Sequence, residues 1–525
     1  MTSHPYRSIA HRRLGKSAAL PTNGVWTRCF GGQMKLARPT IGKFKHLLQS
    51  LGLTACVVLT ACTVGPDYRP PNPTVPDHWV EQPKSAAQSQ QDLSRWWRGF
   101  NDARLNGLIE RALLGNLDVQ MAQSRLQAAR AQITVAESQR WPSINASSAF
   151  QRQRISPNAL LGALGSIQGG RSSSGLLSTI GPIGKPFNLF QAGFDSSWEL
   201  DLFGGLRRQE EAATAQAEAS EESLRDLRVS LTAEVARQYL ELAALHRQLT
   251  VAQERLTDAH ALERLVTASF QEGLATDVDL RQAKTARETV ESAIAPLEAQ
   301  IKSTHHALAL LLGLEPGALD RLLARVVDIP EPPAIQPGLP ADLLRRRPDI
   351  RQAERQVAAA SASIGAAVAE LFPKLSLTGV AGLQSQDLSN FTSLSSGFYG
   401  VGPRLSLPIF AAGRLLANID VQEAGHREAL AGYQKAVLIA LKEVEDGLAQ
   451  AKGAQERLKA LDVAEQESRK AFQGATAYYE EAETDLAQVL AKRRDWHDTR
   501  DRLTQSRLAR ATAHVALYKA LGGGW

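Results

Sequence analysis

The chain has 525 residues, of which 22% are charged, and its formal net charge is +6. The positive excess is confined to residues 1–61, which hold nine Lys and Arg and no Asp or Glu, so the remaining 51 basic and 54 acidic residues give a net charge of −3. This distribution argues against a basic nucleic-acid-binding surface. With only three cysteines, at positions 29, 56 and 62, the sequence predicts no disulfide framework.

Residues 1–61 predict a secretory leader. A basic segment precedes the apolar run of residues 47–61, which is too short and too interrupted to span a bilayer. The run ends in Leu59, Thr60 and Ala61 before Cys62, a pattern similar to a bacterial lipobox, in which the cysteine is acylated. The same tetrapeptide stands at residues 53–56, but Cys62 follows the complete run and precedes a polar segment. An uncleaved or non-lipidated signal is the alternative, and Met34 is an alternative start.

The segment after the leader, residues 62–91, is rich in Pro, Gln and Ser. Because proline-rich chains favour extended conformations, we expect the lipidated cysteine to be followed by an extended tether. Cys62 would be the only cysteine left once the leader is removed.

The chain contains an internal repeat, which is its most informative feature. Residues 118–142 align without gaps on residues 349–373, an offset of 231, whereas later matches have offsets between 207 and 209. Those later matches pair Leu202-Phe203 with Ile409-Phe410, Glu234-Val235 with Glu443-Val444, Thr276-Asp277 with Thr484-Asp485 and Leu312-Gly313 with Leu521-Gly522. The first copy therefore carries about 24 extra residues, which we place in the loop 155–185. We expect copies at 92–313 and 341–525, joined by a linker at 314–340.

Long helices dominate each copy. Residues 206–272 are sixty-seven consecutive residues without glycine or proline, whereas ordinary globular helices rarely exceed about 20 residues. Apolar residues recur there at three- and four-residue steps and form one stripe that needs a partner helix. The stripe consists of Leu224, Leu227, Leu231, Val235, Leu242, Leu245, Leu249 and Leu256. Each copy also opens with a helix, predicted at 106–140 and at 348–371, and returns through long helices.

After each opening helix the hydrophobic period changes from about 3.6 to 2, which predicts strands. Apolar Ile144 and Phe150 alternate with polar neighbours, and the same alternation recurs around Trp198 and in residues 374–383 and 401–409. We therefore predict two β-hairpins, at about 143–202 and about 374–409. Pro403 and Pro408 indicate a bulge or the end of the last strand.

Strands of about ten residues with one apolar and one polar face suit a transmembrane barrel. Four strands cannot close such a barrel, because about eight are the practical minimum. The barrel must then be shared between chains: two chains would supply eight strands and three would supply twelve. A soluble sandwich is disfavoured because four strands are few for so long a chain. The expected fold is mainly α with a small β part, a long antiparallel α-helical coiled-coil barrel continuous with a shared β-barrel.

Five short motifs occur along the chain from residue 62 to its last residue. They are Cys62-Thr-Val-Gly-Pro-Asp-Tyr68; Trp97, Phe100, Asp102 and Leu105; Arg345-Arg-Arg-Pro-Asp-Ile-Arg351 with Ala353-Glu354; Leu407-Pro-Ile-Phe410 with Gly413-Arg414; and Leu517 to Trp525. In this order they resemble the outer membrane efflux protein family, the TolC-like outer membrane factors, and specifically its lipoprotein branch of NodT or OprM type.

The resemblance implies a homotrimer in which four strands per chain form a twelve-stranded outer membrane β-barrel, continued by an α-helical tunnel across the periplasm. It implies the exit duct of a tripartite efflux pump, which passively conducts drugs or other small molecules. The implied partners are a periplasmic membrane-fusion adaptor and an inner-membrane transporter of the resistance-nodulation-division type. Such a duct is not an enzyme and carries no cofactor, only a covalent lipid such as palmitate on Cys62. A duct for ABC-driven peptide or protein export is the alternative.

The resemblance also places the periplasmic tips, which in the family contact the adaptor. The first tip consists of Gly273, Leu274, Thr276 and Asp277, where glycine tolerates the φ > 0 that reversing a helix requires. A plain helix cap is the alternative for Gly273. The second tip departs from the family pattern, since Glu481 aligns with Gly273 and Leu490 stands where the family's gate often has an aspartate.

Three acidic residues of the second tip, Glu481, Glu483 and Asp485, are a candidate periplasmic gate. Three copies of each in a trimer make an acidic constriction that attracts cations, by analogy with charged rings in pores. The alternative is an ordinary solvated charged face. The sequence contains no phosphate-binding loop and no zinc-protease spacing, so it gives no indication of catalysis or of a metal site. A lipid-anchored coiled-coil scaffold without a barrel is the remaining rival.

Overall fold

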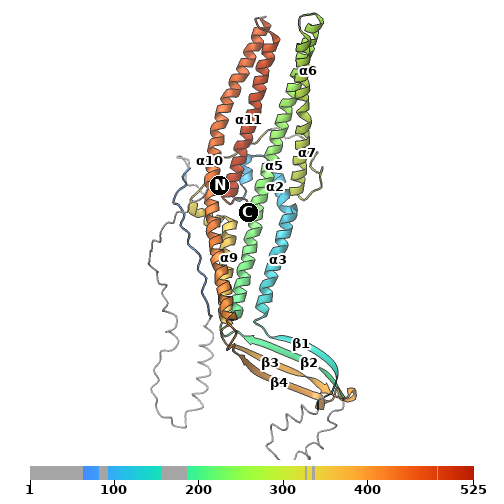
Figure 1. Cartoon of the computed structure of the whole chain (residues 1–525), viewed down its shortest axis with the longest axis vertical. Coiled ribbons are helices and arrows are strands. Elements are labelled where there is room, and N and C mark those ends of the chain that lie inside the picture. The colour runs from blue at the N-terminus through green and yellow to red at the C-terminus, as the bar shows by residue number, and fades with distance from the viewer. Residues whose placement is uncertain are drawn as a thin grey trace, which may run out of the picture. The chain divides into compact units, whose positions relative to one another are not determined.

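The computed structural model describes residues 63–81, 93–154, 156, 186–324, 328–333, 337–481 and 483–525. Contacts divide the chain into Met1–Ala61 and Cys62–Trp525, and all described residues belong to the second unit. The predictions for the leader, for the lipobox with Cys62 and for most of the loop 155–185 lie outside the described residues. Figure 1 shows the second unit, with long helices at one end and a four-stranded sheet at the other.

Two helices of equal length form the scaffold. Helix α5 spans Gly205–Gln271 and helix α10 spans Arg414–Glu480, each with 67 residues, which corresponds to about 100 Å at a rise of about 1.5 Å per residue. Gly204 (φ +78°) and Gly413 (φ +81°) precede them in left-handed conformations. The predicted helix at 206–272 is thus confirmed, and most of its apolar stripe is buried, including Leu224, Leu231, Val235, Leu242 and Leu245.

The helix predicted at 106–140 is two helices, so that prediction is wrong in its continuity. Helix α2 spans Ala103–Gly115 and α3 spans Leu117–Ser138. The residue between them, Asn116, is extended (φ −63°, ψ 130°), and its side chain caps α3 by accepting a hydrogen bond from the backbone N–H of Val119. Asparagine at this position favours a helix start over continuation. The second opening helix, α9 at Pro348–Ala369, agrees with the prediction.

The chain returns from each long helix differently. In the first copy α6 (Asp277–Ser292) and α7 (Ile294–Leu311) are separated at Ala293, whereas in the second copy α11 (Leu486–Ala520) is continuous. Pro296 explains the break, because its ring displaces the carbonyl four residues earlier and it has no N–H to donate. Short elements complete the helical part: η2 (Trp96–Phe100), η3 (Pro340–Asp342) and α8 (Leu343–Arg346).

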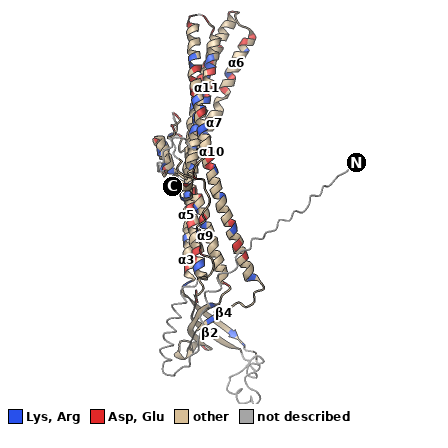
Figure 2. Ribbon diagram, turned by 90° about the vertical axis from the view of Figure 1, so that its left-hand side faces the viewer, with Lys and Arg blue, Asp and Glu red and all other residues tan. Residues whose placement is uncertain are grey.

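The helices that adjoin the sheet form one curved layer. Contacts run from α3 to α5, from α5 to α9 and from α9 to α10, so α3 and α10 are the two edges of the layer. Beyond it, α6 and α7 pack on α5, and α11 packs on α10, which makes two helical hairpins. Figure 2 shows charged residues distributed over these helices, whereas the sheet is mostly uncharged.

The four strands form one antiparallel sheet in the order β1-β2-β3-β4. They are β1 (Ser143–Gln153), β2 (Phe187–Leu200), β3 (Lys374–Ser385) and β4 (Gly397–Ser406), with η4 (Leu388–Asn390) and η5 (Leu394–Ser396) in the second turn. Both predicted hairpins are present, and β2 pairs with β3 to join the two copies. The strand ends differ from the prediction, at residue 200 instead of 202 and at 406 instead of 409.

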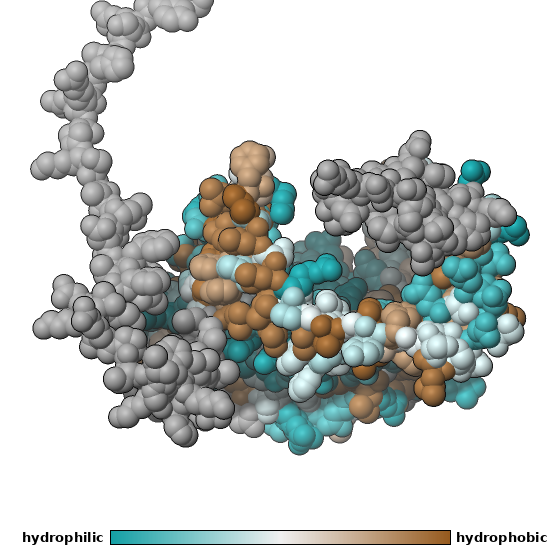
Figure 3. Space-filling view, turned by 90° about the horizontal axis from the view of Figure 1, so that it is seen from below, coloured by the Kyte–Doolittle hydropathy of each residue, from teal (hydrophilic) through white to brown (hydrophobic). Residues whose placement is uncertain are grey.

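The register places most of the large apolar residues of the four strands on one face, as the alternation predicts, whereas Leu189, Val380 and Phe398 lie on the other face. Direct neighbours on this face include Phe150 with Phe190, Phe194 with Ala381 and Leu375 with Leu405. Many large side chains of the face are exposed: Ile144, Phe150, Phe194, Tyr399, Val401 and Leu405. Figure 3, seen from the sheet end, shows such brown apolar surface beside teal polar surface. The sheet therefore has an uncovered apolar face in the described chain.

Pro403 is the exception to the strand prediction. It lies inside β4 opposite Leu377, in a register that continues without interruption from Lys374–Ser406 to Leu383–Gly397. The expected bulge or strand end at this residue is therefore wrong. A proline is tolerated there because β4 is an edge strand, where one side of the backbone has no partner strand within the described chain. The strand ends before Pro408, as predicted.

The core lies where the two copies meet. Trp96 stacks on Tyr518 with ring centres 5.1 Å apart, and Trp97 and Phe100 are buried beside it. The Tyr239 hydroxyl donates to Oδ2 of Asp102 at 2.7 Å, while Oδ1 of Asp102 caps the start of α2. Burial and this hydrogen bond raise the pKa of Tyr239, so the motif around Asp102 fixes the short N-terminal helices on α5.

The repeat is also visible in the contacts at the helix starts. The side-chain amide of Asn116 donates to the carbonyl of Leu311 at 2.9 Å, and Nη1 of Arg347 donates to the carbonyl of Ala520 at 2.8 Å. The two donors are 231 residues apart and the two acceptors 209 residues apart, the same offsets as in the sequence repeat. Each opening helix is thus tied to the last helix of its own copy.

Residues 63–81 are extended, as expected, but they are bound along the helices rather than loose. The backbone N–H of Val64 donates to Phe203, and a Cβ on Gly65 would lie 2.4 Å from the Cα of Gly365. Farther along, the buried Trp79 donates to the carbonyl of Gly338 at 2.9 Å. The linker predicted at 314–340 therefore also contributes to the core, together with the buried Leu319 and Leu323.

None of the helices in the described ranges combines the length and the apolar content that crossing a membrane requires.

Candidate functional site

The free ends of the two hairpins carry the predicted tip residues. At the first tip α5 ends at Gln271, and Gly273 follows with φ +76°. The backbone N–H of Gly273 donates to Phe270, and that of Leu274 donates to Ser269 at 2.8 Å. This is a Schellman-type end, which needs a left-handed residue at the glycine position. A Cβ on Gly273 would meet no atom within 4 Å, so the backbone angle alone explains the glycine.

The rest of the first tip starts the next helix and presents apolar surface. Thr276 caps α6 through a reciprocal capping box with Asp279. Hydrogen bonds from Thr276 lower the pKa of the Asp279 carboxyl. Asp277 pairs with Arg281 at 2.6 Å. Leu274 is 78% exposed, and the structure provides no partner for it in the described chain.

The second tip has the same backbone construction, displaced by one residue from our alignment. The N–H of Glu481 donates to Ala477, and that of Glu483 donates to Tyr478, equivalent to residues 272 and 274 of the first tip. Gly273 thus corresponds to position 482, which lies outside the described residues, and Glu481 corresponds to the residue before it. The alignment of Glu481 with Gly273 is therefore wrong. Matching Thr276-Asp277 to Thr484-Asp485 is wrong by the same single residue.

The structure separates the roles of the three acidic tip residues. Asp485 caps α11 by accepting from the N–H of Gln488 at 2.8 Å, as Thr276 caps α6. Glu481 and Glu483 are exposed and lie on either side of the turn. Asp485 therefore has a structural function of its own, whereas the two glutamates are free to serve a channel.

A network of ion pairs joins the hairpins below the tips, between α5 and α11. Nε2 of His497, which is 1% exposed, lies 2.9 Å from Oδ2 of Asp258, and Arg493 lies 2.8 Å from the same carboxylate. Arg500 pairs with Glu254. Burial acts to raise the pKa of Glu254, but the hydrogen bond and charge of Arg500 hold it below its usual value. The hairpins are thus held together here by charge.

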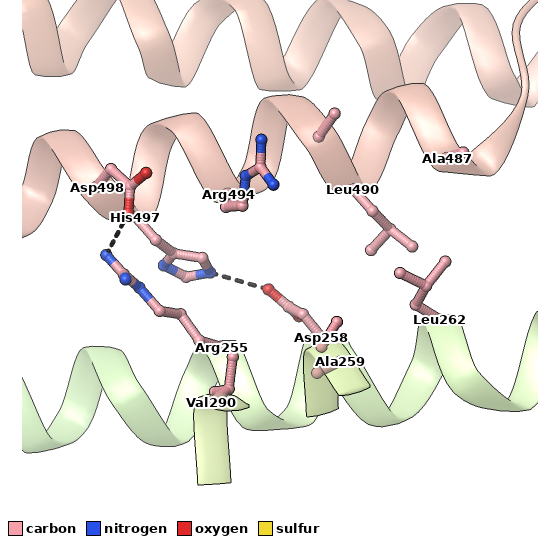
Figure 4. Close-up of a pocket in the computed structure, with 12 residues that line it drawn as sticks. Arg255, Asp258, Ala259, Leu262, Val290, Ala487, Leu490, Arg494, His497 and Asp498 are labelled. Carbon is pink, nitrogen blue, oxygen red and sulfur yellow. Dashed lines mark hydrogen bonds and ion pairs between the residues drawn. The ribbon is translucent and has the colours of Figure 1, made fainter. Parts of the chain in front are cut away.

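A cavity of about 320 Å³ lies beside this network. Figure 4 shows it between α5 and α11, with His497 directed at Asp258 and Arg255 paired with Asp498 at 2.9 Å. Arg494 also lines it, and its other walls are apolar: Ala259, Leu262, Ala286, Val290, Ala487, Leu490 and Ala491. Leu490, noted above at the family's gate position, therefore lines the space between the two hairpins.

Sequence reasoning missed this network, although a signal was present. Arg493, His497 and Arg500 recur at four- and three-residue steps on α11, and Glu254 and Asp258 are four residues apart on α5. Such complementary stripes indicate facing helices. Groups of three or more His, Cys, Asp or Glu suited to a metal ion do not occur in the described part of the chain.

Comparison with known proteins identifies the family. The model of the family described as "Outer membrane efflux protein" matches residues 108–314 and 339–523. The pyoverdine export outer membrane protein OpmQ of Pseudomonas putida is 34% identical over 477 residues, covering 91% of this chain and 96% of the relative. The cation efflux system protein CusC of Escherichia coli O6:H1 is 32% identical over 486 residues, covering 90% of this chain and 98% of the relative.

A solved structure shows the same fold over the same extent. The outer-membrane channel OprN superposes with a TM-score of 0.77 at 33% identity, covering 88% of this chain and 100% of that chain. The family match, the relatives and the structure agree, and the chain belongs to the outer membrane efflux protein family.

Proposed function

We propose that three copies of this chain form the exit duct of a tripartite efflux pump. As a member of its family the chain is an outer membrane channel of an efflux pump and not an enzyme. The main support for a trimeric duct is the four-stranded sheet, which has an exposed apolar face and is continuous with helices of 67 residues. Twelve strands from three chains meet the size that a membrane barrel requires, whereas four do not.

The edges of the chain support this assembly. Within the described chain β1 pairs only with β2, and β4 only with β3, so each sheet edge is available to another copy. The edge helices also expose apolar side chains: Leu117, Met121 and Val135 on α3, and Leu416, Val421 and Leu438 on α10. Exposed apolar patches along both edges of a layer are typical of association surfaces.

For the cargo and partners we propose a small molecule delivered by a periplasmic adaptor and an inner-membrane transporter, of resistance-nodulation-division type. The names of the relatives refer to pyoverdine and to cations, so similar ducts serve chemically different cargoes. A wide passage lined by the polar face of the sheet needs no cargo-specific contacts.

The experiment that tests this function is deletion of the gene in cells that lack redundant ducts, followed by measurement of dye and drug retention. Retention should rise on deletion and return to normal when the intact gene is restored. Unchanged retention, combined with loss of a secreted polypeptide, would instead favour ABC-driven protein export.

We also propose that Cys62 carries the lipid anchor. Thr63 packs against Gly204 at the junction of sheet and helices, and Val64 is bonded to Phe203 there. This junction is where the barrel would meet the inner surface of the membrane, so an acyl chain on the preceding residue could enter the lipid. Cys62→Ala should abolish incorporation of radiolabelled palmitate. Continued labelling of that variant, lost only when Cys56 is also replaced, would show that Cys56 is the modified residue.

For the acidic tip we propose a constriction formed by three copies of Glu481, Glu483 and Asp485. The exposure of both glutamates beside the turn supports it. Replacing Glu481 and Glu483 by glutamine should reduce cation selectivity, measured as the reversal potential of the purified channel in planar bilayers under a salt gradient. Asp485→Asn removes the third carboxylate but keeps the cap of α11, because asparagine caps a helix about as well as aspartate. A loss of selectivity in that variant therefore reports the missing charge and not a displaced helix. An unchanged reversal potential in the double glutamine variant would assign these residues to a solvated face.

A further inference from the structure

Two histidines far from the tips lie close together in the core. His246 on α5 and His305 on α7 have ring centres 6.3 Å apart, with their planes inclined by 43°. His305 is 6% exposed, and His246 is half-buried. Neither the tip turns nor the ion-pair network between the hairpins uses them.

One nitrogen of each ring already has a hydrogen-bond partner. Nδ1 of His305 lies 3.1 Å from Oδ1 of Asp320, and His246 hydrogen-bonds the backbone of Leu323. A carboxylate and a carbonyl can only accept, so each ring donates its Nδ1–H to them. In a neutral ring that donates from Nδ1, the Nε2 atom carries a lone pair.

These two Nε2 atoms are buried, and within the described residues neither has a hydrogen-bond partner. Neutral imidazole nitrogens are the commonest metal ligands in proteins. Buried acceptors without partners are rare in folded proteins and call for an explanation.

The arrangement around the rings is that of a metal ligand pair. Ligating histidines usually donate their other N–H to a carboxylate or a backbone carbonyl, which fixes the tautomer and the ring orientation. In a linear complex, the ion lies between two imidazole nitrogens, each about 2.0–2.1 Å from it. Each nitrogen is about 1.1 Å from the centre of its own ring. The two ring centres must then be about 6.2–6.4 Å apart. The observed separation falls within this range.

We propose that His246 and His305 bind one monovalent copper-group ion, Cu⁺ or Ag⁺, through their Nε2 atoms. Two neutral nitrogen ligands without a third suit a monovalent ion that accepts linear coordination. Zn²⁺ is less suited, because protein sites complete four ligands around it, and the described residues offer no group of three. Imidazole is an accepted ligand of copper.

The site would link three segments that the sequence leaves separate. His246 lies in α5 and His305 in α7, while Asp320 and Leu323 belong to the segment that follows α7. The ion therefore holds this segment, with its buried Leu319 and Leu323, against both helices. This is a function of the helical core and does not depend on the proposed exit duct.

The test is titration of Ag⁺, in chloride-free buffer, into the full-length protein purified in detergent. After desalting, the unchanged protein should retain one silver ion per chain more than His246→Gln/His305→Gln, because silver bound by cysteine thiols is common to both proteins. His306→Gln is the matched control, because His306 is the exposed neighbour on the same helix, and it should bind like the unchanged protein. Zn²⁺ titrated in the same way should not distinguish the unchanged protein from the double variant.

Asp320→Asn keeps both imidazoles and should weaken silver binding by about 10- to 100-fold, measured by competition with a chelator. Asp320→Asn also replaces the double variant as the test if size-exclusion chromatography shows that the double variant does not assemble. Equal silver binding by the double variant, by Asp320→Asn and by the unchanged protein would overturn the proposal. Retention of Zn²⁺ in preference to Ag⁺ at the same two histidines would overturn the assignment of the ion.

Discussion

Replacing Gly273 by proline should abolish export while leaving assembly and outer membrane location intact. Proline fixes φ near about −65°, whereas Gly273 has φ +76° and donates its N–H to Phe270. The variant loses both the angle and the hydrogen bond, so the end of α5 and the start of α6 can no longer keep their relative direction. Because the sheet adjoins the other end of α5 and the buried residues of this helix end at Ala252, the damage remains at the tip.

The size of the effect follows from what the tip must do. If Leu274 and its neighbours contact the adaptor, a reoriented turn presents none of them correctly. Dye and drug retention in a deletion strain carrying Gly273→Pro should equal that of the deletion itself. Assembly is checked by native electrophoresis and location by membrane fractionation.

Gly273→Ala is the matched control. The added Cβ meets no atom within 4 Å, so its only cost is the left-handed conformation, about 1–2 kcal/mol, and export should be reduced only in part. Full export with Gly273→Pro would show that this turn is not the adaptor-contacting tip. Loss of the assembled protein would show that the turn is needed for folding, contrary to our expectation.

The parts of the fold that the sequence predicts are those with a long or strict pattern. The sixty-seven residues without glycine or proline became α5 within one residue at each end. The alternation around Phe150, Phe194 and Leu405 placed those side chains on one face. In each case many residues contribute to the same signal, so single exceptions cannot change it.

The wrong predictions concern places where a single residue determines the local backbone conformation. Asn116 caps α3 and thereby divides a helix that the apolar pattern continues. Pro403 fits an edge strand, which only the strand order reveals. The tip alignment failed because Thr-Asp pairs occur in both copies, yet Thr276 is the cap in one and Asp485 in the other. Likewise, the ion pairs around His497 depend on which helices face each other, which a single sequence does not state.

Of the substitutions proposed for this chain, Arg347→Ala should lower the free energy of unfolding most. This arginine is 7% exposed and joins three helices: it forks onto Asp349 at 2.6 and 3.0 Å, pairs with Glu443 at 2.7 Å and donates to the carbonyl of Ala520 at 2.8 Å. Its removal leaves two carboxylates and a carbonyl without their donor. Breaking a fully buried charge pair on one side typically costs about 3–5 kcal/mol. The side chains of Asp349 and Glu443 are 29% and 46% exposed, so the expected cost lies below that range.

A further carboxylate adds to the cost. Burial raises the pKa of Asp226, the charge of Asp349 raises it further, and Arg347 opposes both. Without Arg347, the repulsion between Asp226 and Asp349 is opposed by the smaller effect of Lys519. We therefore expect Arg347→Ala to lower both the midpoint of thermal unfolding, followed by circular dichroism in detergent, and the amount of protein in the membrane.

The motif that contains Arg347 supplies its own controls. Arg345 is exposed, so Arg345→Ala should unfold at the temperature of the unchanged protein. Arg347→Lys keeps the charge but cannot fork onto Asp349 while also reaching Glu443 and Ala520, and its midpoint should lie between those of the alanine variant and the unchanged protein. If Arg347→Ala and Arg345→Ala unfolded at the same temperature, the contacts of Arg347 would contribute no net stability. The motif would then act during folding and not in the stability of the folded chain. Its contacts select which helix ends meet, and so direct α9 toward α10 and α11.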